Sequence, residues 1–134
     1  VRRDVRPLLS QIGLGVALEY LMDLGMENIA AYEATLRDYT RDRLRELNWI
    51  DVQGDAPHKG AIFSLTMQGA HAHDISTVLD KRGIAVRAGT HCAMPLMQHY
   101  GLTATARASF AMYNTTRDAD ALIDGLVFCR ELFG

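Results

Sequence analysis

Lysine is scarce in this chain, which has 134 residues and only two lysines, Lys59 and Lys81. Chemistry that needs a lysine amine, such as a Schiff base, therefore has only two candidates. Lys59 stands in a turn-rich loop, and Lys81 stands in the last turn of a predicted helix, where a cation complements the helix dipole. Neither context is that of the desolvated lysine that forms Schiff bases. We interpret both as solvated surface residues.

Cysteine, long apolar runs and clustered charge are scarce as well. The two cysteines, Cys92 and Cys129, are far apart, which excludes a disulfide framework and is typical of the reducing cytoplasm. No apolar run approaches the roughly 18–20 residues that span a bilayer. Basic residues are interleaved with acidic ones at a net charge of −2, which argues against a nucleic-acid-binding face. We predict one soluble, cytoplasmic domain with no membrane or nucleic-acid partner.

The first third of the chain is predicted to be helical. In residues 11–24, Ile12, Val16 and Tyr20 recur at four-residue spacing, and Gly25 fits a C-terminal cap. A longer helix is predicted over residues 27–47. Its main stripe is formed by Ile29, Tyr32, Leu36, Tyr39, Arg43 and Leu47.

Strand patterns alternate with short helices in the rest of the chain. Phe63, Leu65 and Met67 alternate with more polar residues, as a half-buried strand requires. Thr115 and Asp118 have the spacing of a capping box at the start of the last helix. Strands are predicted over 49–53, 61–67, 84–88 and 105–113, and helices over 74–82, from 94 and from 115. This order predicts an α+β fold, with helices packed on a small three- to four-stranded sheet.

Cys92 is the first candidate for a catalytic residue. It stands between a predicted strand and a helix that begins near Pro95, where free backbone N–H groups favour an anion. Arg87 and His91 are close in sequence and are expected to add positive potential. Such surroundings favour the thiolate, which is the nucleophilic form of cysteine. The alternative is a buried, inert cysteine, and the residues alone leave both interpretations open.

Arg107 is the second candidate, because it lies in the middle of a predicted strand that is otherwise small or apolar. A guanidinium at such a position needs an anionic partner. One interpretation is an internal salt bridge to an Asp or Glu. The other is a fork that binds the carboxylate of a substrate in bidentate geometry.

A metal site is not predicted. His71 and His73, taken with His91 and Cys92, match no standard zinc spacing, and a second cysteine ligand is lacking nearby. His73 is interpreted more simply as a loop or capping residue at the start of a helix.

Two motifs carry a resemblance to a known family. Residues 87–95 read Arg-Ala-Gly-Thr-His-Cys-Ala-Met-Pro, and residues 106–114 read Ala-Arg-Ala-Ser-Phe-Ala-Met-Tyr-Asn. In this order and at this spacing they resemble the C-terminal domain of group II (SUF-type) cysteine desulfurases of the aminotransferase class V superfamily. The resemblance covers residues 11–134, whereas residues 1–10 fit poorly. It implies the small C-terminal domain of a fold-type I pyridoxal-phosphate enzyme, without the large cofactor-binding domain.

The resemblance also implies a role for each matching residue. Cys92 would be the nucleophile that takes sulfur from a cysteine–cofactor adduct and holds it as a persulfide. Arg107 would bind the α-carboxylate of the substrate, and Arg87 would border the active site. His91 would belong to the active-site loop. Where the family often has two histidines before the cysteine, this chain has Thr90 and His91, so no role of the first histidine is carried over.

The cofactor and partners follow from the resemblance alone. The parent enzyme would use pyridoxal phosphate to convert L-cysteine, or selenocysteine, and would pass sulfur to an acceptor of the SufE or SufU kind for iron–sulfur cluster assembly. It would be a homodimer. No cofactor is expected to bind this chain alone, and the chain alone is expected to be inactive, since the cofactor supplies the electron sink for C–S cleavage.

Two other hypotheses come from different functional classes. The domain could be a stand-alone sulfur carrier or interaction module without desulfurase activity. It could also be a structural domain with an incidental cysteine. A pyridoxal-binding domain encoded directly upstream would distinguish the desulfurase from the carrier, and the reactivity of Cys92 against pH would distinguish both from the structural domain.

Overall fold

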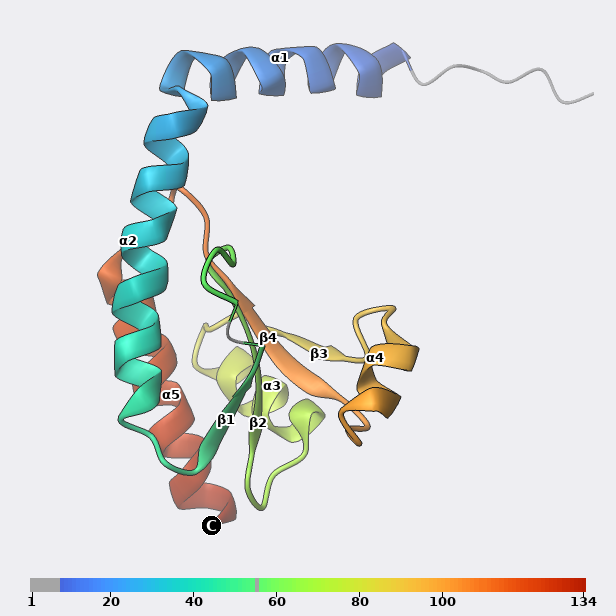
Figure 1. Ribbon diagram of the computed structural model, residues 1–134, viewed down its shortest axis with the longest axis vertical. Coiled ribbons are helices and arrows are strands. Elements are labelled where there is room, and N and C mark those ends of the chain that lie inside the picture. Colours follow the sequence, from blue (N-terminus) through green and yellow to red (C-terminus); the bar gives the residue numbers. More distant parts are fainter. Residues whose placement is uncertain (1–7, 55) are drawn as a thin grey trace, which may run out of the picture. The chain divides into compact units, whose positions relative to one another are not determined.

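A computed structural model describes residues 8–54 and 56–134 (Figure 1). It confirms the predicted α+β class, since five helices accompany a four-stranded antiparallel sheet in this part of the chain. The chain divides into two compact units between Tyr32 and Glu33, and each is described by itself. The elements are α1 (Leu8–Leu24), α2 (Met26–Arg45), β1 (Ile50–Gln53), β2 (Ile62–Met67), α3 (Ala72–Lys81), β3 (Arg87–Gly89), α4 (Met94–His99), β4 (Thr105–Ser109) and α5 (Thr116–Phe133).

The first unit contains α1 and the first turns of α2. Helix α1 begins at Leu8, three residues before the predicted start, while residues 1–7 of the poorly matching segment 1–10 lie outside the described part. Gly25 ends the helix as predicted: its φ is +84°, and its N–H donates to the carbonyl oxygens of Leu21 and Met22. Apolar side chains lie on every side of α1 and are exposed, which is unusual because such helices are normally covered.

The sheet of the second unit has the strand order β1-β2-β4-β3, and every neighbouring pair is antiparallel. Strand β4, the last in sequence, lies between β2 and β3. Its register places Arg107 opposite Ser64 on one side and opposite Arg87 on the other. The motif around Cys92 and the motif around Arg107 are therefore brought together by direct strand pairing.

One face of the sheet forms the core with α3 and α5. Phe63, Leu65 and Met67 of β2 are buried as predicted, and Ala106 and Ala108 of β4 point to the same side. Helix α3 packs against β3, β4 and α5. The helices contribute buried side chains from Ile75, Leu79, Leu122, Ile123, Leu126 and Cys129. This one-sided burial leaves the residues between the core positions of each strand on the other face.

The second half of α2 also contributes to this unit, with Leu36, Thr40 and Leu44 buried. The predicted stripe included Leu36, but it placed Tyr39 and Arg43 where the structure has Thr40 and Leu44. Tyr39 and Arg43 instead contact a carboxylate of α5. The Tyr39 hydroxyl donates to Asp120 Oδ1 at 2.8 Å, and Arg43 Nε lies 3.5 Å from the same oxygen.

Two strands are shorter than predicted. Strand β3 begins at Arg87 instead of residue 84, and β4 ends at Ser109 instead of residue 113. The second end has a local cause, because Asn114 closes a turn: its Oδ1 accepts from the Ala111 N–H, and its own N–H donates to the Ala111 carbonyl. Tyr113 is therefore 78% exposed on a turn and does not belong to the strand.

The other boundaries follow the predictions closely. Met94 begins α4, with Pro95 in its first turn. The N–H of Thr115 donates to Asp118 Oδ2 at 2.7 Å, which is the predicted capping interaction at the start of α5. The predicted loop over residues 54–60 separates β1 from β2, although Asp55 lies outside the described residues. None of the helices in the described part is long and apolar enough to cross a bilayer.

Candidate functional site

The site is built on the face of the sheet opposite the apolar core. Arg107 in β4 and Arg87 in β3 are directly opposite each other, so both side chains start from the same face. Ser64 and Gln53 continue this row across β2 and β1. A polar row that contains two guanidinium groups thus runs across the sheet on the side opposite the apolar core.

Arg107 has no ion pair with any residue of the described ranges 8–54 and 56–134. Its Nε atom is buried and has no hydrogen-bond partner there. Of the two interpretations, the internal salt bridge is therefore not found within this part of the chain. The guanidinium group is instead half-buried, with donors available for an anion that comes from outside the chain.

Cys92 lies in a tight turn that follows β3. The Ala93 N–H donates to the Thr90 carbonyl oxygen at 2.9 Å, and the two residues between them have positive φ angles, 55° for His91 and 60° for Cys92. The side chain of Cys92 is exposed. Cys92 is therefore not the buried cysteine of the alternative interpretation.

Arg87 is the group that touches the thiol. Its Nη2 atom lies 3.9 Å from Cys92 Sγ, at the end of the strand that leads into the turn. Arg87 thus adds positive potential at Cys92, as the sequence predicts.

His91 is held at the site, but it does not add the positive charge that we expected. Its Nε2 atom lies 3.1 Å from the carbonyl oxygen of Thr105 and 2.9 Å from the Thr105 hydroxyl. Burial lowers the pKa of His91, and repulsion by Arg107 and Arg87 lowers it further, although the bond to Thr105 partly offsets these effects. The ring is therefore neutral near pH 7, and the charge of the site comes from the arginines.

Cys129 provides the contrast to Cys92. It is fully buried in α5 within the hydrophobic core, and burial raises the pKa of its thiol. The two cysteines thus differ in access, and burial raises the pKa of Cys129. Cys92 has the exposed position next to a cation that a nucleophile needs, and Cys129 has that of a structural residue.

The histidines at α3 lie outside this cluster. His71 caps the helix, because its Nδ1 accepts from the N–H of His73 at 3.3 Å, and the two rings are stacked. The capping residue is therefore His71, whereas His73, which we predicted as a loop or capping residue, lies in the first turn of α3. Among the described residues, no group of three or more His, Cys, Asp or Glu side chains is arranged to hold a metal ion.

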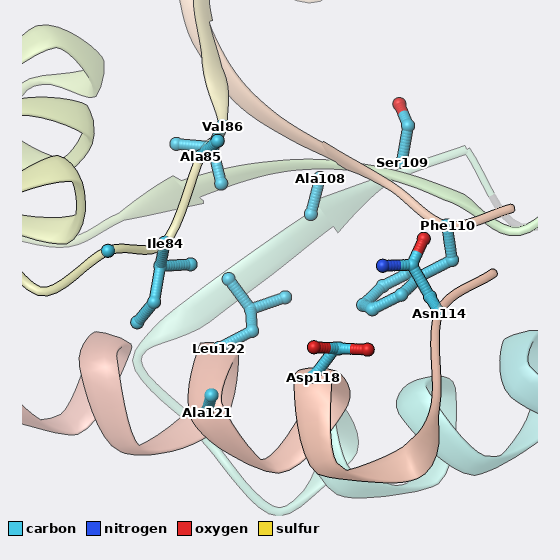
Figure 2. A pocket seen from close by; sticks show the side chains of 11 residues that line it. Ile84, Ala85, Val86, Ala108, Ser109, Phe110, Asn114, Asp118, Ala121 and Leu122 are labelled. Carbon is cyan, nitrogen blue, oxygen red and sulfur yellow. The ribbon is translucent and has the colours of Figure 1, made fainter.

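A separate cavity of about 270 Å³ lies on the core side of the sheet, where the chain before β3 diverges from β4 (Figure 2). Its walls come from residues 83–86, residues 108–110, Asn114 and the first turns of α5, including Asp118. Neither Cys92 nor the two arginines line it. Because Ala108 and Arg107 are neighbours on one strand, they point to opposite faces, and the cavity and the polar row are separate features.

Comparison with known proteins gives the family. The sequence pattern of aminotransferase class-V matches residues 6–122. This chain belongs to the aminotransferase class-V family. Within that family it is 49% identical to a probable cysteine desulfurase of Halalkalibacterium halodurans over 123 residues, which covers 92% of this chain and 30% of the relative. It is 41% identical to a cysteine desulfurase of Haloferax volcanii over 128 residues, covering 95% of this chain and 30% of the relative.

Solved structures of the same family give the same result. The fold matches the cysteine desulfurase CsdA (S-sulfonic acid) of Escherichia coli with a TM-score of 0.90 and 32% identity, over 100% of this chain and 33% of the other. It matches the cysteine desulfurase of Thermococcus onnurineus NA1 with a TM-score of 0.82 and 31% identity, over 91% and 30%. The chain is thus homologous to the C-terminal region of cysteine desulfurases, and it spans about a third of their length.

Enzymes of this family depend on pyridoxal phosphate, and Lys59 and Lys81 are the lysines of this chain that could anchor it. Lys59 donates from Nζ to the Gly54 carbonyl oxygen at 3.0 Å, and the same ammonium lies 4.9 Å from the centre of the Phe63 ring. Lys81 is exposed in the last turn of α3. Neither is a desolvated amine at the Cys92 cluster, so the described residues do not fit a Schiff-base site.

Thr105 is the residue of the cluster that we did not single out from the sequence. It is fully buried and holds the ring of His91. A signal was present, because Thr105 lies two residues before Arg107 on one strand, and such residues share a face. Its partner, however, depends on the fold of the turn, which the sequence does not specify.

Proposed function

We propose that this chain is the sulfur-accepting part of a cysteine desulfurase, with Cys92 as its nucleophile. Arg107 binds the α-carboxylate of the substrate, and Arg87 borders the site and favours the thiolate. The observation that carries this proposal is the joint placement of an exposed thiol 3.9 Å from Arg87 and of Arg107 opposite Arg87 on the next strand. A carboxylate and a sulfur atom of one small substrate are the groups that such a cluster recognises.

The substrate and products follow from the proposed family role. The parent protein converts L-cysteine to L-alanine, and Cys92 keeps the sulfur as a persulfide. Selenocysteine offers the same carboxylate and an analogous selenium atom, so it is an equally suitable substrate for these groups. The persulfide is passed to an acceptor of the SufE or SufU kind for iron–sulfur cluster assembly in the cytoplasm.

The remainder of the enzyme is proposed to come from a longer chain. Residues 11–134 act as its small C-terminal domain, and a large domain supplies the lysine and the other groups that hold pyridoxal phosphate. The exposed apolar residues of α1 and the span of about a third of the relatives support this division. The parent enzyme acts as a homodimer, and the 134-residue chain alone does not turn over cysteine.

Persulfide formation in the longer protein tests the proposal. The protein is treated with L-cysteine, its thiols are alkylated, and the peptides are examined by mass spectrometry. The peptide of Cys92 is expected to gain one sulfur atom, whereas the peptide of Cys129 is expected to gain none.

Cys92→Ser and Cys129→Ala form a matched pair of variants for this experiment. Cys92→Ser should abolish both alanine formation and the extra sulfur atom, and Cys129→Ala should retain both. Retention of normal alanine formation by Cys92→Ser would contradict the proposal. Cysteine turnover by the isolated chain would contradict only the division of labour between the domains.

A further inference from the structure

The turn that carries Cys92 has an unusual backbone. A four-residue turn with positive φ at both central residues is of the mirror-image type I′, which glycine, asparagine and aspartate normally form. Here the central residues are His91 and Cys92, with φ of 55° and 60°. Any residue with a Cβ atom is disfavoured in this region, although Asn, Asp and His are less so than the others, and Cys is not among these. Other contacts must therefore hold the turn in place.

The strongest such contact joins His91 to Thr105. Thr105 is fully buried in β4, and it lies opposite Gly89, the last residue of β3. The carbonyl oxygen of Thr105 can only accept a hydrogen bond, so the 3.1 Å contact requires that the proton of the neutral ring is on Nε2. The Thr105 hydroxyl lies 2.9 Å from the same nitrogen. The ring thus ties the turn to a rigid position in the sheet.

The other ring nitrogen agrees with this assignment. Nδ1 of His91 is buried and has no hydrogen-bond partner among the described residues. A proton on Nδ1 would be both unsolvated and close to the positive charges of Arg107 and Arg87. The ring is therefore neutral and has a structural position. It is not placed to act as a protonated general acid.

We infer that Thr105 and His91 are positioning residues for Cys92. Buried Thr105 fixes the ring of His91, the ring fixes the strained turn, and the turn holds Sγ within 3.9 Å of the Arg87 guanidinium. The inference rests on the proposed function in one respect, since it takes Cys92 to be the reactive thiol. It adds a support for that thiol that touches neither the substrate nor the sulfur atom.

The test compares two substitutions of Thr105 in the 134-residue chain. Thr105→Val keeps the shape and removes the hydroxyl, whereas Thr105→Ser keeps the hydroxyl. Alkylation of Cys92 is measured with anionic iodoacetate and with neutral iodoacetamide. A thiol held beside a guanidinium favours the anionic reagent, and loss of that proximity should lower the iodoacetate-to-iodoacetamide rate ratio by about fivefold.

The expected result is a lower ratio for Thr105→Val and a nearly normal ratio for Thr105→Ser. Thr103→Val, at an exposed position in the loop before β4, serves as the matched control and should keep the normal ratio. Arg87→Met should give the lowest ratio of the series, since it removes the cation. Thr105→Val retains the carbonyl oxygen that also contacts His91 Nε2, so an unchanged ratio in this variant would overturn the role of the Thr105 hydroxyl. An unchanged ratio in His91→Asn, which loses both contacts of the ring, would overturn the inference as a whole.

A second variant keeps the test decisive if Thr105→Val does not fold. His91→Asn removes the ring, and asparagine tolerates a positive φ well, so the turn is retained without its tie to Thr105. Its rate ratio is expected to fall as in Thr105→Val, and a normal ratio would again reject the inference. Because alkylation needs neither substrate nor cofactor, this outcome is independent of whether Cys92 forms a persulfide.

Discussion

Arg87 and Arg107 face each other directly across the antiparallel pair of β3 and β4. Like charges at such positions destabilise a sheet, because cross-strand neighbours are the closest contacts on one face. Arg107 has no carboxylate partner in the described part of the chain that would offset this repulsion. The pair thus lowers the stability of the sheet when no ligand is bound, and an anionic ligand would offset this loss.

Replacing one member of this pair should separate stability from binding. Arg107→Met is expected to leave the free energy of unfolding unchanged or to raise it by about 0.2–1 kcal/mol, because it relieves the repulsion. In the longer protein the same change should raise KM for L-cysteine by roughly tenfold or more, since a charge-assisted hydrogen bond contributes about 1.5–3 kcal/mol.

Arg117→Met is the control for Arg107→Met, because Arg117 is exposed in the first turn of α5. Urea unfolding measures the first effect and steady-state kinetics the second. A loss of more than about 1 kcal/mol in Arg107→Met would mean that its guanidinium has a stabilising partner after all.

The neutral state of His91 predicts a pH dependence of stability. Its pKa in the folded chain is below the ordinary 6.5, chiefly because of burial, and Arg107 and Arg87 also face the ring. The unfolded chain therefore binds more protons as the pH falls below about 6.5. The contribution of His91 is complete above that pH and is lost as the pH falls through the folded pKa.

Urea unfolding at about pH 7.5 and about pH 5 measures this loss. The wild-type chain should lose more stability between these two values than His91→Asn does. The pKa of Asp118 is lowered, mainly by its hydrogen bond from the Thr115 N–H. Its contribution to stability is therefore also lost in acid, but the loss is the same in both proteins. Equal losses in the two proteins would show that the ring is not held neutral by the fold.

The two thiols should react at very different rates in the folded chain. Cys92 is exposed, and Cys129 is fully buried with a raised pKa, so only one thiol should react quickly with a thiol reagent in the native state. The thiol of Cys129 should react only after denaturant has unfolded the chain. Rapid reaction of both thiols in the native wild-type chain at neutral pH would contradict the position of Cys129 in the core.

Gly125 should be intolerant of any side chain. A Cβ atom there would lie 2.5 Å from Leu79 Cδ2 and 2.7 Å from Ile84 Cδ1, so α5 approaches α3 closely at this point. Gly125→Ala is expected to destabilise the chain by about 1–3 kcal/mol through overpacking. Gly13→Ala in α1, where nothing lies within 4 Å, should instead be neutral or stabilising by about 0.5–1 kcal/mol. Thermal unfolding of both variants checks the contrast.

Most of the secondary structure could be predicted, because the apolar periods are clear in β2 and α5 and because Gly25, Pro95 and Asp118 mark the ends of helices. The ends of β3 and β4 could not be predicted. The residues after Ser109 continue an alternating pattern, and the two hydrogen bonds between Asn114 and Ala111 close a turn there. Such a local turn ends a strand that the alternating pattern alone would extend.

The roles of the predicted site residues stay predictions, but their placement can be compared with the structure. Arg87 contacts Cys92 and lies opposite Arg107, which depends on a pairing of β3 with β4 that motif spacing only suggests. The prediction that His91 adds positive charge was wrong, because burial and the two nearby arginines lower the pKa of its ring. Thr105 was overlooked, because its importance comes from one hydrogen bond to a turn 14 residues away in sequence.

The central place of β4 sets an order of assembly on the growing chain. Strand β3 pairs only with β4 among the described strands, so its three residues have nothing to pair with until residues 105–107 have been synthesised. The contact between Thr105 and the cysteine turn then forms together with this last pairing of the sheet. Until that pairing forms, Arg87 and Arg107 are not held opposite each other, so the cluster around Cys92 exists only in the completed fold.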